Sequence, residues 1–306
     1  MVADRAALMP STQRLRQGLA QALLALQHHP GGLLLGPAPG PGAPGLGHFH
    51  LVPELFLQVG GRTRFQFPQA ACWLAPGQAL LLPPLLLHDE WVQPGPAGEP
   101  FSNLVLQADG LRLGCHLAHE ARPGRPGIQH LEAPSHPQAS VIQGWLVEAA
   151  RLAPVVAQDR WAALQAQALV GAAIAATLRA LDDGDARPAA EPVLVARLRV
   201  LVQNQLGDAG LSVGSLARQS GCTADHLSQV FRRSTGRPLL GWINQQRLDR
   251  AERLLRETAM PVKQVAWACG FASPGYFAQC FRQCHGLAPQ AWRLRAAAQD
   301  RPPAAG

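Results

Sequence analysis

The spacing of hydrophobic positions changes from helical to strand-like and back along the chain. Residues 11–28 and 138–181 carry apolar side chains three and four positions apart, which predicts amphipathic helices. Between residues 48 and about 119 the pattern becomes short runs of Val, Leu and Phe separated by turn residues, as in an all-β sandwich or barrel. Helical spacing returns over residues 193–295. We therefore expect a two-domain protein, β-rich with added helices at its N-terminus and all-α at its C-terminus.

Glycine, proline and acidic residues mark the breaks between these regions. Residues 30–47, PGGLLLGPAPGPGAPGLG, predict an irregular approach to a sheet. Gly60-Gly61 indicates a hairpin turn between two strands. Residues 182–192, DDGDARPAAEP, have no periodicity and predict a linker. The expected divisions are thus residues 1–181, the linker 182–192, and residues 193–295.

One pattern of apolar and turn residues occurs twice in the C-terminal region. Each copy has an apolar helical stripe, a glycine, and a second stripe that begins after a good N-cap, Thr223 or Ser273. In the second copy Pro274 takes the first helical position, where its missing N–H costs nothing. Aligning the two glycines superposes the apolar positions: Gly221 with Gly270, Leu216 with Val265, Ala217 with Ala266, Leu227 with Phe277, and Phe231 with Phe281. This arrangement predicts two helix-turn-helix units, each with a second helix that enters the DNA major groove.

The stretch between the copies, LLGWINQQRLDRAERLLRET, keeps helical spacing and predicts a stiff connector. A helix of roughly 19 residues spans about 28 Å, which approaches the roughly 34 Å between successive major grooves on one face of B-DNA. One chain would thus present two recognition helices to adjacent grooves. A plain bundle of helical hairpins would share the periodicity but not the duplicated turn chemistry.

The C-terminal region resembles the AraC/XylS family of bacterial transcription regulators. The resemblance lies in SLARQSGCTADHLSQVFRRSTG, in the connector WINQQRLDRAERLL, and in VAWACGFASPGYFAQCFRQCHGLAPQAWR, which ends on the pair Trp292-Arg293. It implies a cytoplasmic, homodimeric regulator that binds promoter DNA sequence-specifically, responds to a small-molecule or metal effector and works with RNA polymerase. In this family the position of residues 138–181 holds helices that pack on the sensing domain and often form the dimer, and either role fits here.

The formal charge of +7 is unevenly distributed along the chain. Residues 193–295 hold 14 Lys and Arg against 5 Asp and Glu, whereas the remainder carries a net charge of −2. A polyanionic partner is therefore expected for the C-terminal region alone. No stretch reaches the roughly 18 uninterrupted apolar residues of a membrane span, and the N-terminus lacks the pattern of a secretory signal.

Residues of the second helix in each copy that lie off the apolar stripe are expected to face DNA. By resemblance to the family, base contacts come chiefly from Asp225, Ser228 and Gln229, and from Gly275, Tyr276 and Gln279. Gln pairs with adenine, Asp accepts from cytosine, and Tyr packs on a thymine methyl or reaches a phosphate. Gly275 has no side chain, so the second helix would depend more on shape and backbone contacts. The candidate phosphate contacts are arginines: Arg232, Arg233, Arg237, Arg282 and Arg293.

A second motif lies in the β-rich region. Its spacing meets every position of the first cupin motif: Gly42, His48, His50, Glu54 and Gly61. The second cupin motif is met in part, by Gly77, Pro83 and His88. Leu85 and Val92 stand where that motif usually has glycine and asparagine. The resemblance implies a cupin-like jelly roll, which AraC-type regulators often carry as their sensing domain.

Four side chains of these motifs are candidate ligands for a divalent metal: His48, His50, Glu54 and His88. In a strand without a bulge, His48, His50 and Glu54 would share one face, and His88 from a neighbouring strand would close the set. Imidazole and carboxylate ligands suit Zn, Fe, Mn, Ni or Cu. Alternatively, the residues line an organic-effector pocket, or the metal serves a cupin dioxygenase or isomerase with an appended DNA-binding domain. We favour the regulator, because the rest of the sequence supplies no evident catalytic acid or base.

The six cysteines are scattered along the chain and are expected to be reduced. Cys115-His116-x-x-His119 falls where a run of strand residues ends, and surface or core positions suit it better than a second metal site. Cys280 and Cys284 lie one turn apart in the second recognition helix, where packing against the connector is favoured over a thiol sensor.

Overall fold

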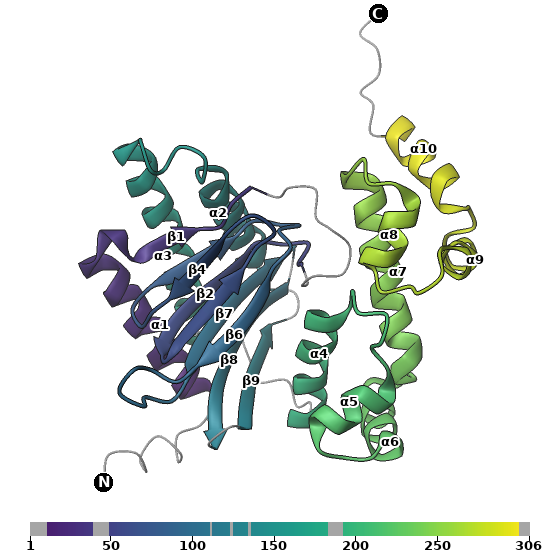
Figure 1. The fold of residues 1–306 in the computed structure, drawn as a ribbon, viewed down its shortest axis with the longest axis horizontal. Coiled ribbons are helices and arrows are strands. Elements are labelled where there is room, and N and C mark those ends of the chain that lie inside the picture. Colours follow the sequence, from purple (N-terminus) through teal and green to yellow (C-terminus); the bar gives the residue numbers. More distant parts are fainter. Residues whose placement is uncertain are drawn as a thin grey trace, which may run out of the picture. The chain divides into compact units, whose positions relative to one another are not determined.

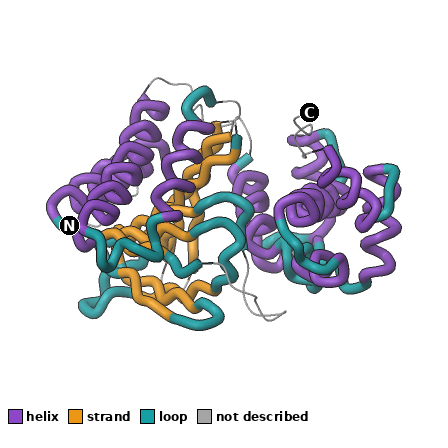
Figure 2. Tube along the Cα trace, turned by 90° about the horizontal axis from the view of Figure 1, so that it is seen from above, coloured by secondary structure: helices purple, strands orange, loops and turns teal. Residues whose placement is uncertain are grey.

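The structure, a computed structural model, describes residues 11–38, 49–110, 112–122, 125–133, 136–182 and 192–299 (Figure 1). The chain divides into two compact units, Met1–Arg197 and Leu198–Gly306. Among the described residues all strands belong to the first unit, and the second is helical (Figure 2). The predicted β-rich N-terminal region and helical C-terminal region are thereby confirmed. Most of the predicted linker, residues 183–191, lies outside the described residues.

The strands of the first unit form two sheets. One has the order β1-β5-β2-β7-β8-β9 and the other has the order β4-β3-β6. Neighbouring strands are antiparallel except β1 and β5, which run parallel. The strands are β1 (Leu33–Leu35), β2 (Glu54–Gly60), β3 (Arg62–Gln66), β4 (Ala71–Leu74), β5 (Ala79–Leu82), β6 (Asp89–Gln93), β7 (Ser102–Asp109), β8 (Arg112–Arg122) and β9 (Arg125–Ala133).

The central strands of the larger sheet are buried on both faces. Because side chains alternate along a strand, Leu55 and Leu57 of β2 join one apolar cluster while Phe56 joins another. The first cluster includes residues from the helices of this unit, and the second includes Phe65 and Leu74 of the smaller sheet. The larger sheet therefore has helices against one face and the smaller sheet against the other.

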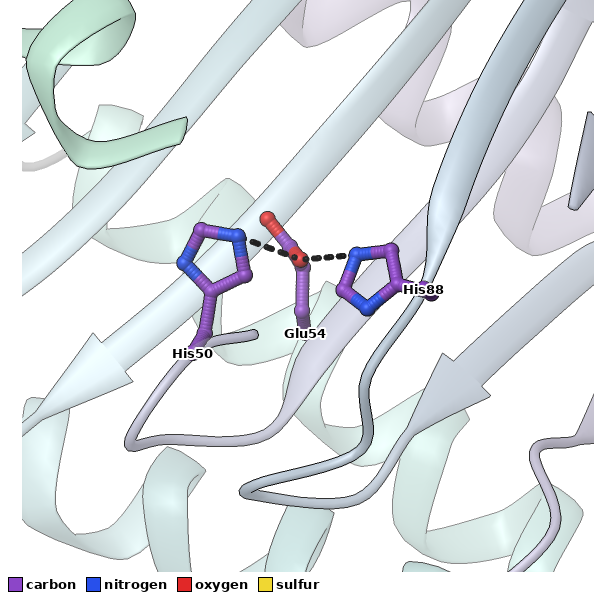
Figure 3. Close-up of side chains that lie close together, drawn as sticks. All are labelled: His50, Glu54 and His88. Atoms are coloured by element: carbon purple, nitrogen blue, oxygen red, sulfur yellow. Dashed lines mark ion pairs between the residues drawn. The ribbon is translucent and has the colours of Figure 1, made fainter. Parts of the chain in front are cut away.

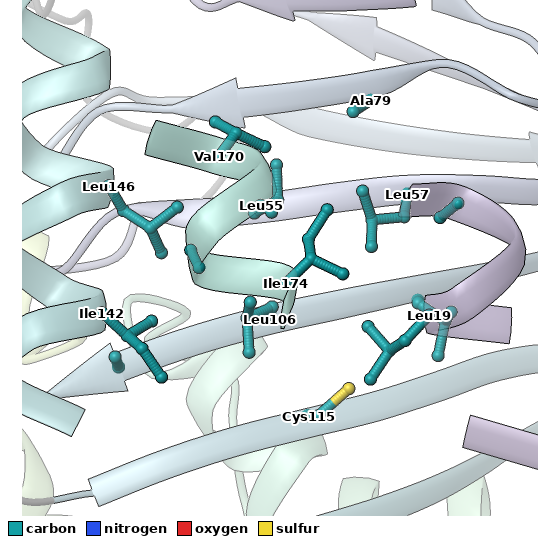
Figure 4. Packing of buried hydrophobic residues seen from close by; sticks show 14 of the residues in the cluster. Leu19, Leu55, Leu57, Ala79, Leu106, Cys115, Ile142, Leu146, Val170 and Ile174 are labelled. Atoms are coloured by element: carbon teal, nitrogen blue, oxygen red, sulfur yellow. The ribbon is translucent and has the colours of Figure 1, made fainter. Parts of the chain in front are cut away.

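Three helices cover the outer face of the larger sheet: α1 (Ser11–His28), α2 (Ala139–Arg151) and α3 (Arg160–Asp182), with a short 3-10 helix η2 (Pro30–Gly32) after α1. Leu19, Ile142 and Ile174, one from each helix, lie in the cluster with Leu106 of β7 (Figure 4). These bounds confirm the helices predicted at 11–28 and within 138–181. Among the described helices α3 is long and apolar enough to span a membrane, but core helices share this composition and Val170 and Ile174 of α3 are buried in this cluster.

Three details of the sheets differ from the sequence prediction. Gly60-Gly61 does not close a hairpin, because β2 pairs with β5 and β7 whereas β3 pairs with β4 and β6. The chain instead crosses between the sheets there, and a Cβ on Gly61 would lie 2.6 Å from the Gln93 carbonyl oxygen. Strand β1 forms inside the segment predicted to be irregular, since its backbone pairs with β5. Strand β9 lies beyond the predicted strand region and pairs with β8.

Residues 192–299 form seven helices: α4 (Val193–Gln205), α5 (Val213–Ser220), α6 (Ala224–Thr235), α7 (Leu239–Glu257), α8 (Val262–Ala268), α9 (Pro274–His285) and α10 (Pro289–Gln299). The hydroxyls of Thr223 and Ser273 accept hydrogen bonds from the backbone N–H groups of His226 and Tyr276, so both predicted N-caps are confirmed. The connector α7 has the expected 19 residues. Gly221 and Gly270, at the two turns, have φ of +69° and +76°, which explains the glycine in each copy.

Candidate functional site

Three of the predicted metal ligands converge in the first unit (Figure 3). The Nε2 atoms of His50 and His88 lie 3.2 and 3.7 Å from the same oxygen, Oε2 of Glu54. The three ligand atoms all lie within 4.8 Å of one another. Glu54 is on the same face of β2 as Phe56, so the cluster lies at one end of the space between the two sheets. This arrangement brings two imidazole nitrogens and one carboxylate oxygen to one buried position.

A turn between β5 and β6 holds both histidines in place. The backbone N–H of Leu85 donates to the His50 carbonyl oxygen at 2.8 Å. His88 Nδ1 lies 2.9 Å from the Leu86 carbonyl oxygen, and a hydrogen bond there requires a proton on Nδ1. The Nε2 lone pair of a neutral His88 then faces Glu54, as a metal ligand requires. Leu85 has φ of +67°, and no other described non-glycine residue has a positive φ. The turn thus keeps a conformation that suits the glycine of the cupin motif.

Two further polar residues at this end of the space between the sheets were missed by the sequence analysis. Gln107 lies opposite Glu54 in the pairing of β7 with β2, and its Nε2 donates to Glu54 Oε1 at 2.5 Å. Glu90 lies opposite Phe65 in the pairing of β6 with β3, on the face that points between the sheets. The signal for Gln107 was present, because it interrupts the apolar strand run NLVLQAD. Its partner could not be read, because strand register is not visible in a single sequence.

Burial shifts the pKa values of these groups in opposite directions. The pKa of Glu54 lies well above its ordinary value, chiefly through burial, with repulsion from Glu90 adding to the rise and the Gln107 hydrogen bond opposing it. Burial and the neighbouring Asp89 raise the pKa of Glu90 to about 7. Burial lowers the pKa of His88 to about 4, against the hydrogen bond to Leu86. At neutral pH His88 is therefore an uncharged imidazole, the form that binds metals.

The remaining predictions for the first unit have mixed outcomes. His48 and Gly42 lie outside the described residues. His50 precedes β2 in an irregular segment, so it reaches Glu54 across a bend and not by strand alternation. Cys115 lies inside β8 and not at a strand end, and burial in the apolar cluster raises the pKa of its thiol to about 12. That thiol is a core side chain.

In the second unit, α6 presents a polar face opposite its apolar stripe. Leu227 and Phe231 are buried, whereas Asp225 and Gln229 are exposed and Ser228 is half-buried. The hydrogen bond from His226 N–H to Thr223 fixes the first turn of this helix. The predicted base-reading residues of α6 therefore lie near its N-terminal end, off the buried stripe.

Helix α9 repeats this arrangement with different side chains. Phe277 and Phe281 are buried, and Gly275, Tyr276 and Gln279 are exposed. Tyr276 is 54% exposed. Within α9 the Phe281 ring stacks on His285 at 4.2 Å. Phe281 also meets Trp292 of α10 edge-on at 5.9 Å, so this aromatic contact joins α9 to α10.

The five candidate phosphate-binding arginines divide into two groups. Arg232, Arg233, Arg237 and Arg282 are exposed. Arg293 is half-buried, and its guanidinium donates to the carbonyl oxygens of Leu255 at 3.1 Å and Met260 at 2.6 Å. It ties α10 to the end of α7.

The two cysteines of α9 lie on its more accessible side. Cys280 is half-buried and Cys284 is exposed. The Cys284 sulfur lies 3.8 Å from Gln245 Nε2 of α7, a contact that fits the predicted packing against the connector.

Comparison with known proteins identifies the C-terminal region. A family model described as "Helix-turn-helix domain" matches residues 216–295. The transcriptional activator AarP of Providencia stuartii is 32% identical over 101 residues, which are 33% of this chain and 74% of that protein. The arabinose operon regulatory protein of Escherichia coli strain K12 is 32% identical over 92 residues, 30% of this chain and 32% of that protein.

Each of these matches covers about a third of this chain. The chain spans about a third of the length of the first curated relatives that it matches. Among solved structures, the DNA-binding domain of AdpA in complex with a target DNA is 30% identical, covers 35% of this chain and 95% of that chain, and has a TM-score of 0.33. The extent of the AarP match, with the helix-turn-helix model, means that this chain belongs to the AraC/XylS family of transcription regulators.

Proposed function

We propose that the chain binds promoter DNA through two helix-turn-helix units, α5–α6 and α8–α9, with α6 and α9 in successive major grooves. One observation carries the proposal: the same capped helix pair occurs twice, with an exposed polar face each time, on either side of the 19-residue α7. At 1.5 Å per residue α7 spans about 28 Å, and successive major grooves lie roughly 34 Å apart. The excess charge of residues 193–295 supplies the attraction to phosphate.

Base recognition would be unequal between the two helix-turn-helix units. In α6, Gln229 would pair with adenine and Asp225 would accept from cytosine, with Ser228 beside them. In α9, Gln279 would read a base and Tyr276 would pack on a thymine methyl, while Gly275 would let the backbone approach the groove closely. Arg232, Arg233, Arg237 and Arg282 would hold phosphates. The backbone contacts of Arg293 favour an anchoring role for that residue over a phosphate contact.

The first unit would be a cupin-like sensing domain with a divalent metal site. Its residues fit such an ion: two imidazole nitrogens and a carboxylate oxygen share one position, and Leu86 and Gln107 orient two of the ligands. His50, Glu54 and His88 would hold the metal, and His48 would be a fourth ligand. The ion would neutralise a carboxylate that burial makes costly, and would link the start of β2 to the turn before β6. Zn, Fe, Mn, Ni and Cu all suit these ligands.

A second copy of the chain is the proposed partner of α3. Trp161 and Leu164 are 64% and 57% exposed on this helix, and the small residues Ala168 and Ala172 continue the same apolar stripe. Exposed apolar faces of this kind mark protein contacts. A homodimer would bring two pairs of recognition helices to one promoter, where RNA polymerase is a further expected partner. A cytoplasmic location goes with this role.

A footprint of the full chain on the DNA flanking its own gene, with and without chelator, tests these proposals. We expect protection of two adjacent major grooves for each half-site, and a change in protection when metal is removed. The His50→Ala protein should give one footprint in both conditions. Absence of any protected sequence would refute the DNA-binding proposal. A footprint that chelator leaves unchanged would refute the metal sensor but not the DNA-binding function.

An enzyme is the less favoured alternative. The curated relatives reported above are named as regulators or activators of transcription. Turnover of a small molecule that is lost in His50→Ala would reverse this preference.

A further inference from the structure

The turn of the second helix-turn-helix unit, α8–α9, contacts the loop that leads into the first unit, α5–α6, beside α7. The loop after α4 contains Leu206, Gly207 and Asp208, and the turn between α8 and α9 contains Cys269, Gly270 and Phe271. A Cβ on Gly270 would lie 2.4 Å from the Leu206 carbonyl oxygen, and a Cβ on Gly207 would lie 3.1 Å from the Ala268 carbonyl oxygen. Contact this close leaves no room for a Cβ at Gly270, and a Cβ at Gly207 would require the neighbouring backbone to shift by a few tenths of an ångström. We refer to residues 206–208 and 268–271 as the junction.

Arg247 of α7 connects the two sides of the junction. It is 8% exposed, and its guanidinium donates to the carbonyl oxygens of Asp208 at 2.9 Å and Leu206 at 3.4 Å. The same guanidinium lies 5.8 Å from the centre of the Phe271 ring, on the other side. Burying a charged side chain is costly unless its donors are satisfied, and here two carbonyl groups and an aromatic face supply the partners. Arg247 of α7 therefore connects the loop before the first helix-turn-helix unit to the turn of the second.

The equivalent turn of the first helix-turn-helix unit makes no such contact. Gly221 aligns with Gly270 and has the same left-handed backbone, but a Cβ on Gly221 would meet no heavy atom within 4 Å. Both turns thus have a glycine with a left-handed backbone, but only the turn of the second helix-turn-helix unit is packed closely against another segment. Local turn formation explains the glycine at both positions, but it does not explain the close packing at Gly270.

We propose that Arg247 is a positioning residue that fixes the angle between α6 and α9, and that it thereby sets the spacing of the two base-pair blocks that the chain accepts. The inference rests on the proposed function, since it requires both units to bind one duplex. One inserted base pair moves the second block by about 3.4 Å and rotates it by roughly 35°. A rigid junction cannot follow that displacement, whereas a loosened one follows it at little cost.

The test uses the full chain and a duplex obtained by its selection from random DNA. Between the two protected blocks of that duplex, one or two base pairs are inserted. For the wild-type chain we expect one insertion to weaken binding roughly 10-fold or more, about 1.4 kcal/mol. For Arg247→Lys and Gly270→Ala we expect that ratio to fall to roughly 3-fold or less. Lys keeps the charge but loses the forked donors.

Gly221→Ala is the matched control. It has the same unfavourable backbone conformation as Gly270→Ala, but it adds a methyl group to open space. The control should keep the full wild-type penalty for an inserted base pair. A full penalty in both Arg247→Lys and Gly270→Ala would overturn the proposal.

Hydrogen exchange without DNA separates failure of this inference from failure of the proposed function. We expect backbone amides of the junction to exchange at least several-fold faster in Arg247→Lys, while those of the first turns of α6 and α9 stay unchanged. If the wild-type chain selected no duplex, the DNA-binding proposal would fail. Hydrogen exchange would still test whether Arg247 holds the junction together. Unchanged junction exchange would overturn the role of Arg247.

Discussion

The two candidate sites hold their polar side chains in opposite environments. Asp225 and Gln229 of α6 project into solvent from a helix with an ordinary N-cap, so they cost the fold little. Glu54 and His88 are buried, their pKa values are displaced in opposite directions, and the turn beside them contains the unfavourable backbone of Leu85. A buried ionisable cluster lowers stability, so its presence at one position points to a functional site. For exposed residues the indication comes from their position on a duplicated fold.

The largest effect is expected from removing the buried charge. In Glu54→Gln the amide oxygen would still accept from Gln107, and the amide N–H groups would donate to the imidazole lone pairs. We expect the chelator-treated variant to be more stable than the wild type at pH 8, by roughly 2 to 3 kcal/mol, because no carboxylate has to ionise in a dry site. Urea denaturation at several pH values measures the difference.

The pH dependence of that difference follows from the direction of the shift. The folded pKa of Glu54 lies above the unfolded value, so this group stabilises the protein fully below the unfolded pKa, near 4.3. The stabilisation is lost as pH rises through the folded pKa. The advantage of Glu54→Gln should therefore be smallest near pH 5 and grow toward pH 8. Added Zn²⁺ should stabilise the wild type, by about 2.7 kcal/mol at 100 times its Kd, and leave Glu54→Gln unaffected. An advantage that did not change with pH would contradict the assignment.

The contrast between the sites also explains which features the sequence predicted. Helix ends in the second unit depend on local signals, so Thr223, Ser273 and the two turn glycines were readable directly. The first unit depends on pairing between strands far apart in sequence. The contact between Gln107 and Glu54 follows from that pairing and was missed. The crossing between sheets at Gly60-Gly61 also follows from it, so the predicted hairpin turn there was wrong.

The candidate metal ligands are an intermediate case. Motif spacing predicted that His50, Glu54 and His88 lie together, and in the structure they do. The expected cause, side-chain alternation along a strand, was wrong for His50, which precedes β2. The turn at Leu85 positions both histidines instead: the Leu85 N–H donates to the His50 carbonyl oxygen, and the same turn leads into His88. The base-reading residues and the domain bounds remain predictions.

The next effect concerns the exposed faces of α6 and α9, the proposed recognition helices. Gln229→Ala and Gln279→Ala should each cost roughly 1 to 3 kcal/mol on the selected duplex and relax discrimination at one or two base positions. Neither should change the urea midpoint, because both side chains are exposed. Gln283→Ala is the matched control: it lies one turn beyond Gln279 on α9, is equally exposed, and should leave specificity unchanged. Equal weakening of selected and random DNA would contradict base reading.

A smaller effect on stability is expected at the turn beside the buried cluster. Leu85→Gly keeps the left-handed backbone but removes its cost, which is about 1 to 2 kcal/mol for a non-glycine residue. The greater freedom of glycine in the unfolded chain partly offsets this gain. We expect a net gain of roughly 0.5 to 1 kcal/mol in the free energy of unfolding. Leu87→Gly, two residues along the same segment and without a positive φ, should lower stability. A loss of stability in both variants would mean that the Leu85 side chain contributes more by packing than its backbone costs.

The smallest effect on DNA binding distinguishes Arg233 from Arg293, which the sequence analysis both predicted to contact phosphates. Arg233 is exposed, so Arg233→Ala should weaken selected and random duplexes alike and lower the slope of log affinity against log salt by about 0.9, the contribution of one phosphate contact. Arg293→Ala removes donors to two backbone carbonyls, so it should lower the free energy of unfolding by roughly 1 to 3 kcal/mol and leave the salt slope unchanged. Binding assays across 50 to 200 mM salt, on the order of the range in which such slopes are read, distinguish the two. If Arg293→Ala also flattened the slope, its guanidinium would have to leave α7 when DNA binds, and the division of the five arginines into surface and anchoring groups would no longer hold.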